Sequence, residues 1–402
     1  MSRADRRKLL ADQLAERGIP IDTVKAVLKC QSIETPSWGY GNSGTRFAVF
    51  RQPGAARDIH ERLADAAFVH KLTGICPSVA IHIPWDKTSD YAALTQQATE
   101  LGVRIGSVNP NVFQEPAYKL GSFGNPDPRV RGKAMEHMAE CIEIMQKTGS
   151  RVLSLWFADG TNYPGQDSFR RRKRFFLACL KEVYSRLPED AVMLLEYKPF
   201  EPAFYHTDIA DWGMAFAFCR KLGPKAKVLV DLGHHLPGAN IEHIVSFLID
   251  EDALGGFHFN NRKYADDDLT TGSINPYEVF LIHHEIVSAE AYDLAFMVDQ
   301  SHNLKPKLEA MITTAMFLQE SLARALLVDT VQLGEAQATG DIVLAERCLQ
   351  QAFTTDVSPL VEEIREEMGC PPDPLIAYRQ SGYQQRIEAE RQGQKGTSSG
   401  WA

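Results

Sequence analysis

Four apolar segments of this chain each end in a side chain that can bind a metal ion. They are Val192–Glu196, Val228–Asp231, Gly256–His258 and Ala295–Asp299. Their polar ends can meet at one point only if the segments are parallel neighbours in a closed sheet. Three carboxylates gathered with an imidazole would repel one another unless a divalent cation lay among them. The pattern therefore predicts a metal centre formed by Glu196, Asp231, His258 and Asp299.

Nearby residues could hold a second ion. His234 follows Asp231 by three positions on a glycine-containing turn, and the run Asp266-Asp267-Asp268 follows His258. In an extended loop Asp266 and Asp268 would point to one side and Asp267 to the other. The second set would then be His234, Asp266 and Asp268, with Asp231 shared, although an acidic solvated loop is the alternative. Oxygen-rich ligation favours Mn²⁺, with Co²⁺ or Mg²⁺ next and Zn²⁺ last.

Two further polar residues have a position suited to catalysis. Lys198 lies two residues beyond Glu196 and so shares its strand face. There an ammonium group could polarise a carbonyl or stabilise a negative oxygen. His82 ends another apolar run and is a candidate acid or base, with Asp86 as its expected orienting partner. A buried, hydrogen-bonded structural histidine is the alternative interpretation of His82.

Three aromatic residues, Trp85, Phe113 and Trp156, are expected at the same mouth. Flat aromatic faces suit the apolar C–H faces of sugars, although they could also serve packing alone. The chain contains no P-loop, no GxGxxG and no GxSxG motif, so phosphate-cradle, dinucleotide and serine-hydrolase functions lack support.

The elements that must position these residues alternate between strand and helix. The predicted strands are Trp38–Phe47, Val79–Pro84, Arg104–Val108, Arg151–Trp156, Val192–Glu196, Val228–Asp231, Gly256–Phe259 and Leu294–Asp299. Between them, apolar residues recur at three- and four-residue spacing, which is typical of helices. Eight β-α units predict an α/β fold, a (β/α)₈ TIM barrel.

We expect four regions along the chain. Residues 1–36 form an N-terminal helical cap, and residues 37–303 form the barrel. Residues 304–383 form a helical C-terminal extension, and the polar residues 384–402 form a disordered tail. The glycine-rich stretch 40–54 is expected to be a loop over the site.

Composition limits the class of protein. The 402 residues are 44% hydrophobic and 24% charged, with a net charge of −9. This acidic balance argues against nucleic-acid binding, and no apolar run approaches the ~20 residues of a membrane span. The seven scattered cysteines form no CxxC pair. These features suit a cytoplasmic enzyme that acts on a neutral small molecule.

Several motifs together resemble a known family. They are Glu196-Tyr-Lys198, Asp231-Leu-Gly-His-His235, the segment from His258 to Asp268, and Asp299-Gln-Ser-His302. They are similar to the metal motifs of the xylose isomerase-like superfamily, and within it to the broad-specificity bacterial L-rhamnose isomerases. The resemblance spans residues 37–303 and also takes in His82-Ile-Pro-Trp-Asp86 and Trp156.

The resemblance implies a homotetrameric, Mn²⁺-dependent enzyme that interconverts L-rhamnose and L-rhamnulose. It implies that Glu196, Asp231, His258 and Asp299 hold a structural ion and that His234, Asp266 and Asp268, with Asp231, hold a second ion. His82, Lys198 and Asp299 are then the catalytic candidates. His82, Trp85, Phe113, Trp156 and Lys198 are the expected substrate contacts. In similar enzymes the loop corresponding to residues 40–54 reaches a neighbouring subunit's pocket, here through Phe47 or Phe50.

The expected reaction opens the sugar ring and then moves hydrogen between C2 and C1. A hydride shift assisted by two cations is favoured, because the candidate carboxylates all serve as metal ligands. Proton abstraction through an enediol is the alternative route. A ketose 3-epimerase on the same barrel is the main rival function. A barrel endonuclease would need a basic rim, which the acidic composition does not favour.

Overall fold

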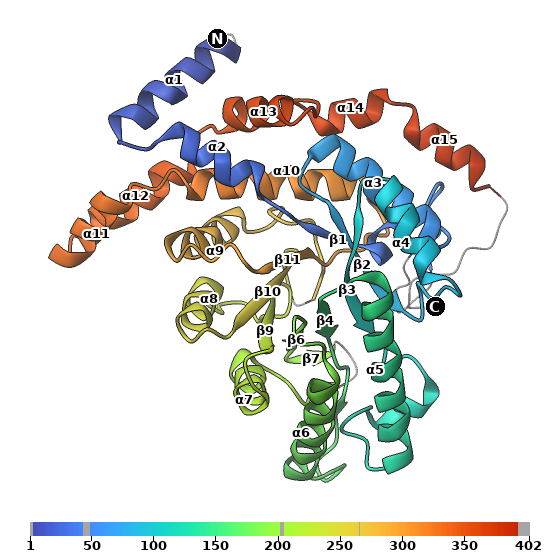
Figure 1. Ribbon diagram of the computed structural model, residues 1–402. Helices are drawn as coiled ribbons and strands as arrows, with labels where there is room; N and C mark the ends of the chain where they lie inside the picture. Colours follow the sequence, from blue (N-terminus) through green and yellow to red (C-terminus); the bar gives the residue numbers. More distant parts are fainter. Residues whose placement is uncertain (1–2, 43–48, 202–204, 265, 393–402) are drawn as a thin grey trace.

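The computed structural model describes residues 3–42, 49–201, 205–264 and 266–392. Its centre is a closed barrel of parallel strands in the order β1-β11-β10-β9-β6-β4-β3-β2 (Figure 1). These strands are β1 Glu34–Pro36, β2 Ser78–Ile83, β3 Arg104–Pro110, β4 Val152–Leu155, β6 Val192–Glu196, β9 Ala226–Asp231, β10 Leu254–Phe259 and β11 Ala295–Val298. The predicted (β/α)₈ barrel is therefore confirmed.

Each barrel strand is followed by a helix on the outside of the barrel. These helices are α3 Ile59–Thr73, α4 Tyr91–Glu100, α5 Pro128–Thr148, α6 Phe169–Arg186, α7 Trp212–Leu222, α8 Ile241–Asp250, α9 Pro276–Ser288 and α10 Lys307–Ala325. Several begin at a side-chain cap, as at Asp58, whose carboxylate accepts from the N–H of Glu61. Gly74 and Gly149 end α3 and α5 in the left-handed conformation that glycine adopts without strain.

The first strand lies elsewhere than expected. Residues 34–36 form β1, which pairs with β2 and β11, whereas Ser37–Tyr40 forms the 3₁₀ helix η1. The prediction of a strand over Trp38–Phe47 was wrong for its described part, and residues 43–48 lie outside the described residues. The three residues of β1 are buried but do not form an apolar run, so the sequence pattern did not reveal the strand. The buried carboxylate of Glu34 is satisfied by hydrogen bonds from the Ser107 hydroxyl, 2.5 Å away, and from the Ser107 N–H.

The barrel also extends beyond residue 303. Helix α10 packs between α9 and α3 and so completes the outer ring, which the predicted boundary had placed in the extension. Two small additions lie in the loops that follow β3, β4 and β6. The antiparallel strands β5 Gly160–Thr161, β7 Phe200–Glu201 and β8 Tyr205–Thr207 form a separate sheet, and Pro116–Leu120 forms the 3₁₀ helix η2.

The remaining helices lie outside the ring. They are α1 Arg3–Glu16, α2 Ile21–Lys29, α11 Thr330–Thr339, α12 Ile342–Phe353, α13 Ser358–Glu367, α14 Pro374–Gln380 and α15 Tyr383–Glu390. Figure 1 shows α13, α14 and α15 laid across α10 and α3. Among the described residues no single helix is long and apolar enough to cross a membrane, and only α10 and α11, bent by 61°, reach that threshold as a pair.

The prediction of a disordered tail from residue 384 was wrong for its described part. Residues 384–390 belong to helix α15, which buries Tyr383 and Ile387 against the barrel. The Phe68 and Tyr383 rings stack with centroids 3.9 Å apart. Arg391 then pairs with the buried Asp65 at 2.8 Å. The prediction relied on the polar composition, but the two buried apolar residues are enough to hold this short helix against the barrel. Residues 393–402 lie outside the described part of the chain.

Candidate metal centre

Strand alternation brings the four predicted ligands to one end of the barrel. Leu194, Leu229 and Met297 form an apolar layer inside the barrel. Because side chains alternate along a strand, the residues two positions further on point to the same interior side. Those residues are Glu196, Asp231 and Asp299. His258 reaches the same level since it pairs in register with Asp231.

The four side chains lie within reach of a common centre. One ligand atom from each of Glu196, Asp231, His258 and Asp299 lies within 4.8 Å of all the others. His258 Nδ1 is 3.3 Å from Glu196 Oε1, 3.6 Å from Asp231 Oδ2 and 3.8 Å from Asp299 Oδ2. In the part of the chain that the structure describes, this is the one group so arranged.

The electrostatics of this group suit a cation. Burial, reinforced by the Asp231 and Glu196 carboxylates, raises the pKa of Asp299 to about 6, although His258 opposes the shift. Burial alone would lower the pKa of His258, but Glu196 and the other carboxylates raise it well above its usual value. A bound divalent ion would take over the role of that imidazolium proton. The oxygen-rich donor set with one imidazole therefore fits a divalent metal ion.

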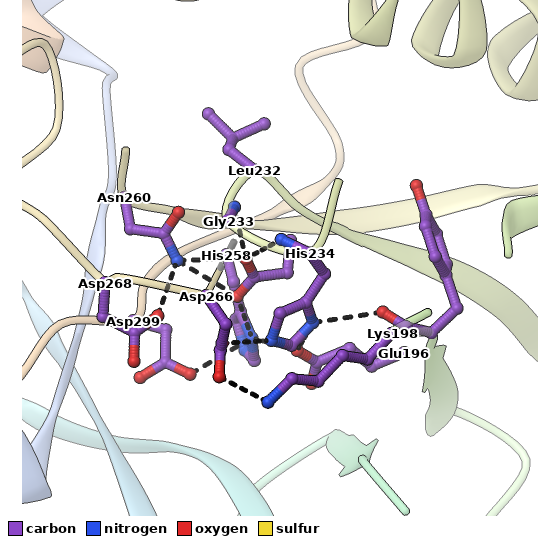
Figure 2. Close-up of polar contacts among 12 residues, drawn as sticks. Glu196, Lys198, Leu232, Gly233, His234, His258, Asn260, Asp266, Asp268 and Asp299 are labelled. Atoms are coloured by element: carbon purple, nitrogen blue, oxygen red, sulfur yellow. Dashed lines mark hydrogen bonds and ion pairs between the residues drawn. The ribbon is translucent and has the colours of Figure 1, made fainter. Parts of the chain in front are cut away.

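The second predicted set lines the same cavity. His234 Nε2 is 2.9 Å from Asp266 Oδ1, and Asn260 Nδ2 donates to Asp231 Oδ1 at 3.0 Å and to Asp268 Oδ1 at 3.4 Å. Figure 2 shows Asp266 between the imidazole of His234 and the ammonium of Lys198. Burial and the neighbouring Asp266 and Asp299 raise the pKa of Asp268 well above its usual value. These residues are gathered less closely than the first four.

The acidic loop is not extended as expected. Asp266 and Asp268 have φ values of 55° and 43°, in the left-handed region. Both nevertheless line the cavity, whereas Asp267 turns back and accepts from the N–H groups of Lys263 and Tyr264. Aspartate tolerates this backbone conformation better than most residues. A compact turn therefore places Asp266 and Asp268 on one side and Asp267 on the other, as was predicted from an extended loop.

A cavity of about 130 Å³ opens beside the metal group. The predicted contacts His82, Trp85, Phe113, Trp156 and Lys198 all line it. The ring of His82 stacks on Trp85 with centroids 3.7 Å apart, and Phe113 meets Trp156 edge-on at 4.8 Å. The aromatic residues therefore form one wall, and the polar residues form the other.

Lys198 joins the two walls. Its ammonium nitrogen is 2.7 Å from Glu201 Oε2, contacts Asp266 and lies 5.1 Å from the centre of the Trp156 ring. Burial alone would lower the pKa of Lys198, but Asp266 and Glu201 raise it above its usual value. Lys198 therefore remains charged at neutral pH.

The expected pairing of His82 with Asp86 is wrong. Asp86 accepts from the backbone N–H of His82 at 2.8 Å, from Arg62 at 2.5 Å and from Ser37, and this set includes no atom of the imidazole ring. The buried Arg62 competes for the carboxylate because it would otherwise be an unpaired charge. Among the described residues His82 Nδ1 has no hydrogen-bond partner. Burial lowers the pKa of His82 to about 3, so the ring is neutral at pH 7.

Several lining residues escaped the sequence analysis. Trp38 lies on η1 and donates from Nε1 to Asp299 Oδ1 at 2.8 Å. Ser154 and Asn109 line the cavity from β4 and β3. Trp38 could have been found only with β1 placed at residues 34–36, since it then follows a strand end. The loop over residues 40–54 is described only in part, since Phe47 lies outside the described residues, and Phe50 is exposed.

The family description "xylose isomerase-like TIM barrel" matches residues 68–287. The chain belongs to this family. Among curated relatives, a "probable sugar isomerase" of Rhizobium meliloti (strain 1021) is 45% identical, covering 97% of this chain and 93% of its own length. A second "probable sugar isomerase", of Mesorhizobium japonicum, is 43% identical with the same coverage.

Solved structures share the fold at low sequence identity. A D-psicose 3-epimerase from Clostridium cellulolyticum H10 superposes with a TM-score of 0.50 at 11% identity, covering 74% of this chain and 97% of that one. A D-allulose 3-epimerase from Methylomonas sp. gives 0.52 at 15% identity, covering 73% and 98%. At these identities the likeness concerns the barrel alone.

Proposed function

We propose that this chain is a metal-dependent sugar isomerase that interconverts L-rhamnose and L-rhamnulose. The observation that carries the proposal is the group Glu196, Asp231, His258 and Asp299 at the carboxyl end of the barrel, next to a cavity with one aromatic and one charged wall. The match over almost the whole length of two probable sugar isomerases supports the reaction class. The motif resemblance to L-rhamnose isomerases supports the substrate.

Two divalent ions, Mn²⁺ first among the candidates, would occupy this end of the barrel. Glu196, Asp231, His258 and Asp299 would hold one ion, and His234, Asp266 and Asp268 with Asp231 would hold the other. When bound, such ions polarise a carbonyl and lower the pKa of a neighbouring hydroxyl, which is the chemistry that a 1,2-isomerisation needs.

His82 would assist the opening of the sugar ring. Its Nδ1 lacks a partner among the described residues, and the ring is held flat against Trp85. Because its pKa is far below neutrality, His82 would pass a proton on rather than hold one. Lys198 would stabilise negative charge on the sugar oxygen that lies nearest to it.

The remaining lining residues would orient the open sugar. Asp299 has the most exposed side chain of the four metal ligands, at 25%, and so would face the substrate directly. Phe113, Trp156 and Trp85 would contact the C6 methyl group of rhamnose. An apolar contact of this size discriminates by about 1–3 kcal/mol, so related aldoses should react more slowly.

The proposal is tested by measuring ketose formation from L-rhamnose. Activity should disappear with a chelator and return with Mn²⁺, and a panel of aldoses should rank L-rhamnose first. Starting from C2-deuterated rhamnose, a hydride shift leaves the label on C1, whereas loss to solvent indicates the enediol route. The absence of ketose from every aldose would contradict the proposal. A homotetramer should elute at about four times the 44.9 kDa chain mass.

A ketose 3-epimerase is the second candidate. Glu196, on β6, and Asp299, after β11, both line the cavity and could act as an acid/base carboxylate pair. Incubation with L-rhamnulose distinguishes the two functions. An isomerase yields the aldose, whereas an epimerase yields a second ketose and no aldose.

A further inference from the structure

Behind the cavity, one hydrogen-bonded pair connects two of the segments that carry candidate ligands. Tyr197 lies between Glu196 and Lys198, but its side chain is buried and its hydroxyl lies 2.7 Å from His235 Nε2. The two rings meet edge-on with centroids 5.4 Å apart. Tyr197 extends strand β6, and His235 lies in the turn that follows β9. The pair therefore joins strand β6 to the turn that carries His234.

The partners of each histidine fix which ring nitrogen carries a proton. His235 Nδ1 faces the Leu232 carbonyl at 3.4 Å, so Nδ1 donates and Nε2 accepts from the Tyr197 hydroxyl. His234 Nδ1 lies 3.1 Å from the Tyr197 carbonyl and 3.1 Å from Glu196 Oε1. Both atoms are acceptors, so Nδ1 of His234 also carries a proton. Its Nε2 lies 2.9 Å from Asp266 Oδ1, so this nitrogen carries a proton that the proposed second ion would displace.

We propose that Tyr197 and His235 are positioning residues that hold His234 with Nε2 directed at the second ion. This inference rests on the proposed function, because it requires that a second ion bind at His234, Asp266 and Asp268. A histidine ligand works best when its other nitrogen donates to a fixed acceptor, since that contact sets both the tautomer and the ring orientation. Here the fixed acceptor is the Tyr197 carbonyl, and the Tyr197–His235 bond holds that residue in place.

Few other contacts hold the turn that carries His234. His234 lies outside any helix or strand, on a turn whose N–H groups at Gly233 and His234 donate to Asp231 Oδ1. Those bonds hold the backbone of the turn from one side. The Tyr197–His235 bond holds it from the other side, and the His234 ring lies between the Tyr197 carbonyl and Asp266. Without the tyrosine hydroxyl the ring of His234 would have more freedom to rotate away from Asp266.

The test is a Mn²⁺ titration of the metal-free protein by calorimetry, with Tyr197→Phe compared to the wild type. The second site is identified as the one lost in Asp268→Asn. Tyr197→Phe should weaken that site by about 10- to 100-fold and leave the first site unchanged. Activity at low Mn²⁺ should fall in step, and excess Mn²⁺ should restore it.

Matched variants separate positioning from packing. Tyr378→Phe removes another buried tyrosine hydroxyl bond, to Gln384 at 2.6 Å, and should leave both metal sites unchanged. His235→Gln keeps an acceptor for Tyr197 and should bind the second ion more tightly than His235→Leu. The His235 variants also decide the matter if Tyr197→Phe does not fold.

Two results would overturn the inference, and they differ from each other. If the wild type binds two ions and Tyr197→Phe or His235→Leu binds both as tightly, the pair serves packing only. The same conclusion follows if both sites weaken equally. If the wild type binds a single ion, the two-ion part of the proposed function fails, and the inference fails with it.

Discussion

At the scale of single residues, Asp231 has the most demanding position in the proposed site. It is fully buried, accepts from Gly233 and Asn260, and would be shared by both ions. Asp231→Asn should therefore lower isomerase activity by more than about 100-fold, because it removes an anionic ligand from each site. Steady-state assays with saturating Mn²⁺ check this. Asp267→Asn in the acidic loop should retain most of the activity, and equal losses in both variants would contradict the assignment.

The role proposed for His82 can be tested separately, because His82 would act in ring opening and not in the hydrogen transfer that follows. His82→Asn should slow the reaction of L-rhamnose by about 100-fold, the usual contribution of an acid/base group. Glyceraldehyde is too short to form a sugar ring, so its isomerisation should be affected far less. Rates on both substrates are compared in the two proteins. A similar loss on glyceraldehyde would place His82 in the transfer step instead.

The four ligands predicted for the first ion share one property, and the missed residues lack it. Glu196, Asp231, His258 and Asp299 each end an apolar run, so strand periodicity alone aligns them. Trp38 follows a three-residue strand that contains no apolar run. The hydrogen-bond partners of Asp86 are Arg62 and Ser37, which are distant from it in the sequence. Long-range pairing of this kind leaves no local pattern. The link from Tyr197 to His235 was missed for the same reason.

At the scale of elements, the C-terminal helices are held to the barrel by a buried ion pair. The side chains of Arg391 and Asp65 are 5% and 0% exposed and lie 2.8 Å apart, and Tyr383 also donates to Asp65 at 2.8 Å. Arg391→Met should lower the free energy of unfolding by about 3–5 kcal/mol, because it leaves a buried carboxylate unpaired. Urea denaturation followed by circular dichroism checks this.

Arg379 provides the matched control on helix α14. It pairs with Glu309 at 2.8 Å, but its side chain is 62% exposed. Arg379→Met should leave the free energy of unfolding almost unchanged, because solvent screens an exposed ion pair. Equal destabilisation by the two variants would show that burial of the Arg391–Asp65 pair does not increase its contribution to the free energy of unfolding.

The fold was more predictable in its centre than at its ends, for a physical reason. The strand β9 and helix α3 carry continuous apolar patterns because each is covered by neighbours along its whole length. Helix α15 needs only Tyr383 and Ile387 to dock, so its sequence is dominated by exposed polar residues. Helix α10 has the pattern of any amphipathic helix, and only its contacts with α9 and α3 show that it belongs to the ring.

At the scale of the whole molecule, buried histidines make stability depend on pH. His283 lies in the core with Nδ1 2.9 Å from the Ser321 hydroxyl, and burial lowers its pKa to about 4 from 6.5. As the pH falls below 6.5, His283 becomes protonated in the unfolded chain, whereas in the folded chain it stays neutral until the pH reaches about 4. Stability should therefore decrease across this window, by on the order of 3 kcal/mol from His283 alone.

Urea denaturation at a series of pH values between 7.5 and 4 measures this dependence. His283→Gln cannot take up the proton and should show a shallower decrease over the same window, whatever its stability at pH 7.5. Parallel curves for the two proteins would mean that His283 does not contribute. Because His283 packs against Ser321 on α10 rather than in the cavity, metal content should not alter the difference.

The contact between Arg391 and Asp65 also bears on how the protein is made. The two residues are separated by 326 positions, yet Asp65 is sealed from water in part by Arg391 and Tyr383. At roughly 5–20 residues per second, a ribosome needs on the order of tens of seconds to span that interval. During this time the nascent chain carries an unsealed acidic group on its first barrel helix, a transient surface that chaperones or proteases could bind before synthesis reaches the final helix.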